Sequence, residues 1–204
     1  MKLSTIKLVA LAGLALSFAT HAGAGIEIGK AAPDFTAIGS DGKSYTLSEL
    51  RGQRVVLEWT NADCPYVRKH YGAGNMQALQ KDAADNDILW LSVISSAPGK
   101  QGHVNAQGAD ALSESRSATP ATVLLDESGD VGKLYGARTT PHMYIVDEDG
   151  TLVYAGGIDD KPTANPADID SATNYVRQAM EELLAGKAVS VTTSRPYGCS
   201  VKYN

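Results

Sequence analysis

Cysteine offers the clearest covalent chemistry in this sequence, and the chain has only two, Cys64 and Cys199. Cys64 follows the apolar run Arg54–Trp59 and precedes Pro65, a residue suited to the first position of a helix. A sulfur at a helix start faces unpaired backbone N–H groups and the positive end of the helix dipole, which stabilise a thiolate. The pattern predicts a pKa for Cys64 below the usual value of about 8.5, and a nucleophilic role. The alternative is an inert, buried cysteine that packs as a small apolar side chain.

The charged neighbours of Cys64 act on its ionisation in opposite directions. Arg68 and Lys69 lie one helical turn further on and add positive charge, whereas Asp63 precedes the thiol and opposes its ionisation. His70 lies nearly two turns from Cys64 if the helix is regular. We expect His70 to be a solvated helix residue rather than a partner of the thiol.

A copper site is the main alternative to a catalytic thiol. Thiolate and imidazole both favour copper, and Cys64, His70 and His142 would supply them if the fold brought them together. No closely spaced ligand motif supports such a site. This alternative would make the protein a periplasmic copper-binding or copper-delivery module.

Thr140 and Pro141 are a second feature, because they directly precede a predicted strand at His142–Val146. A cis bond between them would present the Thr140 backbone to a nearby thiol. Only about 5–6% of X–Pro bonds are cis, so the sequence alone favours an ordinary trans proline at the start of a strand.

Cys199 lies close to the C-terminus, far along the chain from Cys64. As a resolving thiol, it would attack the sulfur of a sulfenic acid or mixed disulfide formed on Cys64 and leave a Cys64–Cys199 disulfide. As a structural partner, it would close a very long loop and stabilise the fold by roughly 4–5 kcal/mol. Exchange between two chains is a third role, and the sequence leaves all three open.

The order of apolar runs and turn residues predicts an α/β fold. Two short strands flank a turn at Ser40–Lys43, and a short turn follows at Leu47–Leu50. The other predicted strands are Arg54–Trp59, Ile88–Ile94, Ala121–Leu125, His142–Val146 and Leu152–Ala155. Helices are predicted from Cys64 to about Ala83, at Ala109–Arg116, at Val131–Tyr135 and at Ile169–Leu184.

Several remaining residues are assigned structural rather than chemical roles. Trp59 and Trp90 are expected in the core, and Asp159 and Asp160 in a solvated turn. The acidic stretch Asp147–Gly150 is expected to be a hairpin turn. No Gly-rich phosphate loop is present, so no organic cofactor is expected.

The N-terminus has the features of a signal peptide. Lys2 and Lys7 precede an apolar run from Leu8 to Ala19, and Ala22-Gly23-Ala24 suits cleavage before Gly25. The sequence thus predicts an exported, periplasmic or secreted, protein without a stable membrane anchor. Its net charge of −5 argues against a nucleic-acid partner. The expected organisation is a signal peptide at 1–24, a domain at 25–190 and an extended tail at 191–204 carrying Cys199.

Several motifs together resemble the exported, peroxiredoxin-like branch of the thioredoxin-fold redoxins. They are Ala32-Pro33-Asp34-Phe35, Trp59, Asp63-Cys64-Pro65-Tyr66-Val67, Thr140-Pro141, the segment Leu152 to Asp160, and Gly198 to Tyr203. The resemblance covers about residues 26–204. It implies a thioredoxin-like fold, with a mixed central sheet, helices on both faces and an N-terminal β-hairpin extension.

The resemblance also implies a thiol-dependent oxidoreductase that performs thiol–disulfide exchange or peroxide reduction. Cys64 falls at the family's attacking cysteine and Pro141 at its cis-proline. We therefore expect Thr140, Pro141 and Pro65 to face the substrate. Cys199 is the candidate second redox residue, on its own position in the sequence rather than on the resemblance. The partners would be a peroxide, or a protein or small-molecule disulfide, and a thiol reductant.

The chain departs from the family patterns at three positions beside Cys64. Val67 stands where a CxxC motif has its second cysteine, and Asn61 stands where other relatives have one. Thr60 is one position away from the peroxiredoxin hydroxyl. A local dithiol is therefore excluded, and a non-catalytic protein with one structural Cys64–Cys199 bridge remains an alternative.

Overall fold

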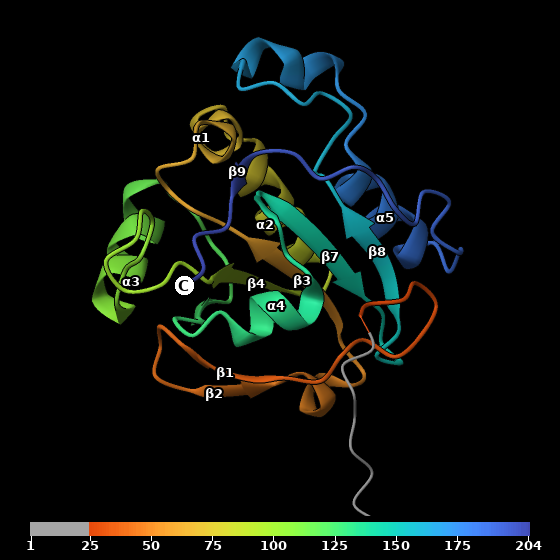
Figure 1. Cartoon of the computed structure of the whole chain (residues 1–204). Helices are drawn as coiled ribbons and strands as arrows, with labels where there is room; N and C mark the ends of the chain where they lie inside the picture. Colours follow the sequence, from red (N-terminus) through yellow and green to blue (C-terminus); the bar gives the residue numbers. More distant parts are fainter. Residues whose placement is uncertain (1–24) are drawn as a thin grey trace, which may run out of the picture.

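A seven-stranded mixed sheet forms the centre of the computed structural model, which describes residues 25–204 (Figure 1). The strand order is β2-β1-β5-β4-β3-β7-β8. The strands are β1 (Thr36–Gly39), β2 (Ser44–Thr46), β3 (Arg54–Trp59), β4 (Ile88–Ile94), β5 (Thr122–Leu125), β7 (His142–Val146) and β8 (Leu152–Gly156). β3, β4 and β5 are parallel, whereas β7 pairs antiparallel with β3. The predicted mixed sheet and N-terminal hairpin are confirmed; the predicted signal peptide lies outside the described residues.

Helices cover both faces of this sheet, as predicted. The helices are α1 (Pro65–Gly72), α2 (Asn75–Asp85), α3 (Ala106–Ser115), α4 (Asp130–Tyr135) and α5 (Tyr175–Leu184), with 3-10 turns η1 (Leu47–Leu50) and η2 (Pro166–Ser171). Alternate residues of β3 point to opposite faces: Val56 packs in the core with α1, α2 and α5, whereas Leu57 packs in the core with α4. β3 and β4 are buried on both faces, which explains their nearly continuous apolar sequences.

Two predicted helices were wrong in extent. The helix predicted from Cys64 to about Ala83 is interrupted after Gly72, because Gly74 adopts a φ of 73° and begins α2 instead of continuing α1. The helix predicted at Ile169 begins only after Asn174, whose side chain accepts a hydrogen bond from the Arg177 amide. Both helices are therefore shorter than predicted, and of the two only α1 begins at the candidate site.

Glu58 is a buried carboxylate within β3 that helps to hold α1 against the sheet. It accepts hydrogen bonds from Tyr71 Oη of α1 at 2.9 and 3.1 Å. Trp90 Nε1 and Ser92 Oγ each donate to Glu58 Oε2 at 2.9 Å. Because these donors satisfy the carboxylate, its burial is compatible with a stable core.

The C-terminal tail crosses the molecule beside α1 and ends between α3 and α4 (Figure 1). Within it, β9 (Cys199–Ser200) forms a small antiparallel sheet with β6 (Thr139–Thr140). The register places Thr140 opposite Cys199. The tail therefore returns to the start of α1 from the far end of the sequence. None of the helices in residues 25–204 combines the length and apolar character needed to cross a membrane.

Candidate active site

Cys64 occupies the N-cap of α1, and Pro65 is the first helical residue, as the sequence predicts. A short loop after β3 leads to it, and Asn61 holds this loop by accepting the Asp63 amide at 2.9 Å on its side chain and the Cys64 amide at 3.0 Å on its carbonyl. The Cys64 side chain is fully buried, whereas Pro65 is exposed. The rigid end of a central strand thus fixes the thiol at the helix start.

The structure brings Cys64, Thr140, Pro141 and Cys199 together. Cys64 Sγ donates to the Thr140 carbonyl at 3.0 Å, and the Cys199 amide donates to Cys64 Sγ at 3.4 Å. The Thr140–Pro141 bond is cis, in contrast to the trans bond favoured by base rates. Both cysteines are free thiols. The two thiols and the backbone of the buried residue Thr140 therefore meet at one point.

The two thiols differ in acidity. Burial opposes ionisation of Cys64, but hydrogen bonds from the Cys199 thiol and from the backbone amides of Val67 and Cys199 outweigh it and hold its pKa below the usual range. Burial raises the pKa of Cys199 to about 11, and the neighbouring Cys64 thiolate contributes to this rise. At neutral pH, Cys64 is therefore the stronger nucleophile and Cys199 is a protonated thiol.

Gly198 makes the close approach of the tail to β6 possible. Its φ is +135°, and an added Cβ would lie 2.0 Å from the Thr140 carbonyl oxygen. No other residue type fits this contact without moving the tail.

Gly198→Ala should therefore weaken the pairing of Cys199 with Cys64. Backbone strain of about 1–3 kcal/mol corresponds to roughly a five-fold to 150-fold fall in the equilibrium constant for the Cys64–Cys199 disulfide. Titration against glutathione redox buffers measures this constant. Gly186→Ala is the matched control, since Gly186 also has a positive φ of +67° but open space around its Cβ position. Equal effects of the two variants would contradict the steric explanation.

His70 is buried, not solvated as the sequence predicted. Its Nε2 lies 3.1 Å from Tyr197 Oη, and its Nδ1 lies 2.8 Å from the side-chain nitrogen of Asn75. The break after Gly72 places Asn75 at the start of α2, and the tail supplies Tyr197. Because both partners depend on tertiary structure, the local sequence gives no signal for this burial.

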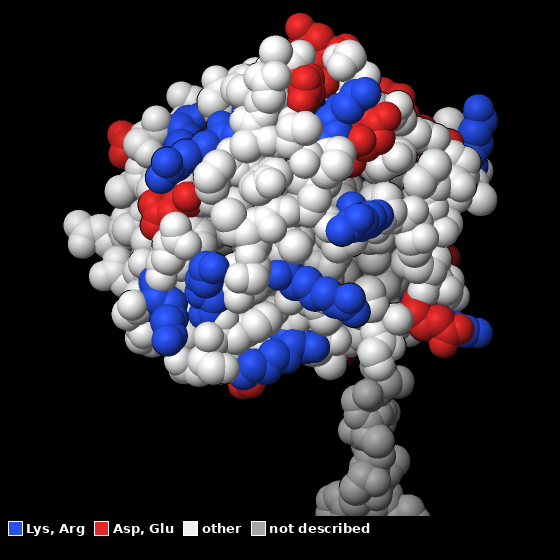
Figure 2. All heavy atoms as spheres, turned by 45° about the horizontal axis from the view of Figure 1, so that its top comes forward, with Lys and Arg blue, Asp and Glu red and all other residues white. Residues whose placement is uncertain are grey.

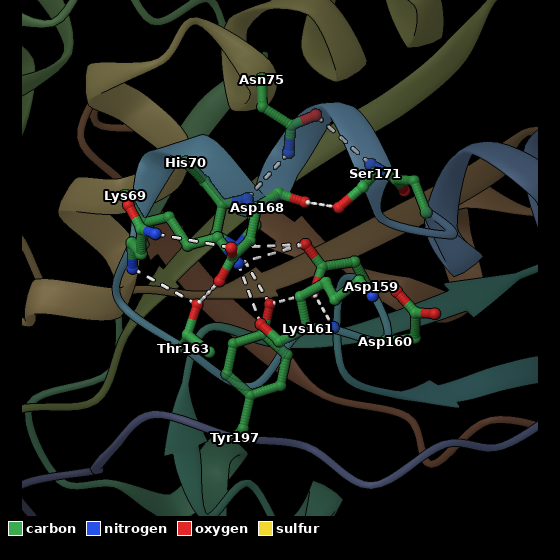
Figure 3. Close-up of polar contacts among 12 residues, drawn as sticks. Lys69, His70, Asn75, Asp159, Asp160, Lys161, Thr163, Asp168, Ser171 and Tyr197 are labelled. Atoms are coloured by element: carbon green, nitrogen blue, oxygen red, sulfur yellow. Dashed lines mark hydrogen bonds and ion pairs between the residues drawn. The ribbon is translucent and has the colours of Figure 1, made fainter.

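Asp159 was also wrongly expected in a solvated turn, whereas Asp160 is exposed as predicted. Asp159 is 3% exposed and accepts hydrogen bonds from Tyr197 Oη at 2.5 Å and from the Lys161 amide at 2.9 Å (Figure 3). Lys69 Nζ lies 3.6 Å from Asp159 Oδ2 and donates to the Lys161 carbonyl at 2.9 Å. The charge of Lys69, expected to act on Cys64, is thus paired with Asp159. We call Lys69, His70, Asp159 and Tyr197 the anchor cluster.

His142 lies on the other side of Pro141 and is buried. Its Nδ1 is 3.3 Å from the donating Arg138 amide and 3.1 Å from Tyr144 Oη. His70 and His142 are both engaged with protein groups, so neither is free to bind copper together with Cys64. Residues 25–204 contain no group of three or more His, Cys, Asp or Glu residues arranged to hold a metal ion.

Acid should destabilise the protein through these two histidines. Burial is the largest cause that lowers the pKa of His70 and of His142 to about 4, from 6.5. Between these values the unfolded chain binds protons that the folded chain does not, so stability falls as pH drops from 6.5 to 4. Each histidine contributes up to roughly 3 kcal/mol of this loss. Urea unfolding at several pH values gives the free energy of unfolding as a function of pH. Between pH 6.5 and 4 this free energy should fall less steeply for His142→Asn than for the wild type; an equally steep fall would contradict the role assigned to His142.

Charges around this side of the molecule are mixed. Figure 2 shows the surface with the top of Figure 1 turned forward: Lys and Arg side chains are scattered over both its upper and its lower half, and most visible Asp and Glu lie toward the rim. Neither sign forms a continuous patch on this face. The surface shown therefore offers no broad field that would select a charged polymer.

The mixed sheet, the helix that begins at Cys64 and the cis proline beside that thiol define a thioredoxin-like protein. The family described as Redoxin matches residues 27–174, and the chain belongs to this family. The match ends before the tail, so Cys199 lies beyond it.

Curated relatives and a solved structure agree with this assignment. The chain is 27% identical over 148 residues to the thioredoxin-like protein YneN of Bacillus subtilis, covering 72% of this chain and 82% of YneN. It is 24% identical over 138 residues to the thiol-disulfide oxidoreductase ResA of Bacillus cereus, covering 63% and 68%. A hypothetical protein of Sinorhizobium meliloti, SMc02350, has a similar crystal structure, with a TM-score of 0.72, 25% identity and coverage of 88% and 96%.

Proposed function

We propose that the protein is a thiol–disulfide oxidoreductase in which Cys64 attacks and Cys199 resolves. The observation that carries this proposal is the pairing of β6 with β9, which holds the Cys199 amide 3.4 Å from Cys64 Sγ. The opposite pKa shifts of the two thiols assign the attacking role to Cys64. Similarity to a protein named thiol-disulfide oxidoreductase supports the same chemistry.

The reaction proceeds in two exchanges. The Cys64 thiolate attacks one sulfur of a substrate disulfide, forms a mixed disulfide and releases the other sulfur as a thiolate, which takes up a proton. Cys199 then loses its proton and attacks the Cys64 sulfur, which releases the second substrate thiol and leaves a Cys64–Cys199 disulfide. The substrate disulfide has gained two electrons, and an external thiol reductant returns the protein to its dithiol form.

Pro141 and Thr140 would border the incoming substrate, and Pro65 would lie at the exposed edge of the site. The Thr140 carbonyl accepts a hydrogen bond from Cys64 in the free protein, so substrate binding must rearrange this contact. The signal-peptide pattern at residues 1–24 supports an exported protein, where disulfide substrates are common.

Stoichiometric reaction with 5,5′-dithiobis(2-nitrobenzoate) tests the proposal. The reduced wild-type protein should release two thionitrobenzoate anions and keep no adduct, because Cys199 displaces the second one. Cys199→Ser should release one and retain a mixed disulfide on Cys64, detectable by mass. Adducts retained on both cysteines of the wild type, or an adduct-free Cys199→Ser protein, would contradict the resolving role.

Peroxide reduction is a second candidate, favoured by one observation. The Thr140 hydroxyl is buried and makes no hydrogen bond within residues 25–204, although its own carbonyl contacts Cys64. A peroxide oxygen would satisfy this hydroxyl while the thiolate attacks, giving a sulfenic acid and an alcohol or water. Cys199 would then form the disulfide and release water. A rate constant for hydrogen peroxide well above that for disulfides would favour this function over disulfide exchange.

A further inference from the structure

Cys64 is fully buried, and the C-terminal tail contacts its sulfur through the Cys199 amide. The tail is held on both sides of Cys199. After Cys199, the Val201 amide donates to the Arg138 carbonyl at 3.0 Å and Tyr203 Oη donates to the Ala137 carbonyl at 2.8 Å. Before Cys199, Tyr197 is buried and belongs to the anchor cluster, where it contacts His70 and Asp159. A substrate disulfide therefore cannot reach Cys64 while both attachments hold.

The attachment before Cys199 involves charged groups. Tyr197 Oη donates to Asp159 Oδ1 at 2.5 Å, and its ring lies 5.7 Å from Lys69 Nζ (Figure 3). Burial and the bond to Asp159 raise the pKa of Tyr197, so its hydroxyl stays protonated and keeps donating. Hydrogen bonds to ionised acceptors are roughly twice as strong as neutral ones. After Cys199, the hydrogen bonds between the tail and the domain join neutral groups, and Lys133 Nζ lies 5.8 Å from the Tyr203 ring.

The anchor cluster is also tied directly to the helix that carries the nucleophile. Lys69 and His70 belong to α1, which begins immediately after Cys64, and Asp159 lies beyond the end of β8. Tyr197 is two residues from Cys199. The Tyr197–Asp159 hydrogen bond therefore holds the tail against the domain and keeps Cys199 close to Cys64.

We propose that the Tyr197–Asp159 hydrogen bond is a latch that holds the tail closed over Cys64, with Tyr197 and Asp159 as positioning residues. The proposal rests on the thiol chemistry proposed above. The latch has opposite effects on the two exchanges. It slows the attack of Cys64 on substrate, because the tail must lift first, and it speeds resolution, because it returns Cys199 to the mixed disulfide.

Tyr197→Phe tests the latch, since it removes the hydroxyl and keeps the ring. Stopped-flow reaction with 5,5′-dithiobis(2-nitrobenzoate) resolves the first and second thionitrobenzoate releases. Loss of a hydrogen bond to a charged group should speed the first release and slow the second, each by roughly ten-fold. Tyr66→Phe is the control, because its ring packs edge-on against Tyr197 at 5.8 Å and its hydroxyl takes part in none of the hydrogen bonds found among residues 25–204. It should leave both rates unchanged.

Hydrogen exchange separates latch opening from general destabilisation. In Tyr197→Phe the amides of Cys199 and Val201 should exchange faster, while those of β3 and β4 keep wild-type rates. Equal acceleration in the central strands, or unchanged rates for both releases, would overturn the latch. If Cys64→Ser reacts like the wild type, the proposed function fails. Even in that case, the hydrogen-exchange rates of the Cys199 and Val201 amides in Tyr197→Phe, compared with the wild type, show whether Tyr197 holds the tail.

Discussion

Replacing Cys64 with serine should lower the rate of disulfide exchange by about 1,000-fold or more, the size of effect typical for loss of a catalytic nucleophile. A serine hydroxyl is not ionised at neutral pH, and the hydrogen bonds that lower the pKa of Cys64 cannot produce an equivalent nucleophile. Reduction of insulin disulfides with an external thiol reductant is a suitable assay.

Cys199→Ser is the matched control for this prediction. It should lose turnover but keep a single rapid reaction at Cys64, so the two variants separate attack from resolution. Retention of more than about a tenth of the wild-type rate by Cys64→Ser would contradict the nucleophilic role.

Asp159→Ala should have the largest effect on stability, with a loss of about 3–5 kcal/mol in the free energy of unfolding. Lys69 is fully buried and would be left without its carboxylate partner, while Tyr197 and the Lys161 amide would lose their acceptor. Urea unfolding of the reduced protein measures the loss.

The neighbouring Asp160 provides the control, because it is exposed and its carboxylate accepts a hydrogen bond from the Thr173 amide alone among residues 25–204. Asp160→Ala should cost about 1 kcal/mol or less. The double variant Lys69→Met, Asp159→Leu should recover part of the loss, since it removes both buried charges together. A loss below about 1 kcal/mol for Asp159→Ala would show that the pair does not stabilise the fold.

The sequence predicts the strands and the position of the nucleophile well, because these depend on local patterns. Arg54–Trp59 and Ile88–Ile94 have the predicted bounds, since strands buried on both faces are continuously apolar. Cys64 and Pro65 occupy the predicted helix start because capping preferences are local. The cis geometry at Pro141 follows from the family resemblance rather than from base rates.

The anchor cluster could not be predicted from local patterns. His70 and Tyr197 are 127 residues apart, and Lys69 and Asp159 come from different elements. A lysine or histidine on a short helix is usually solvated, whereas here the folded tail, the loop after β8 and the start of α2 lie against these side chains. The glycine before Cys199 is the one local signal of the close approach, since only glycine fits against the Thr140 carbonyl.

The pH dependence of alkylation at Cys64 tests the central claim most directly. Reduced protein is treated with iodoacetamide across a pH series, and modification of each cysteine is measured by peptide mapping, with the urea-unfolded chain as the reference. The lowered pKa of Cys64 predicts a midpoint below that of the same residue in the unfolded chain, and the raised pKa of Cys199 predicts a midpoint near 11. A midpoint for Cys64 at or above its unfolded value would contradict an activated thiolate at the start of α1.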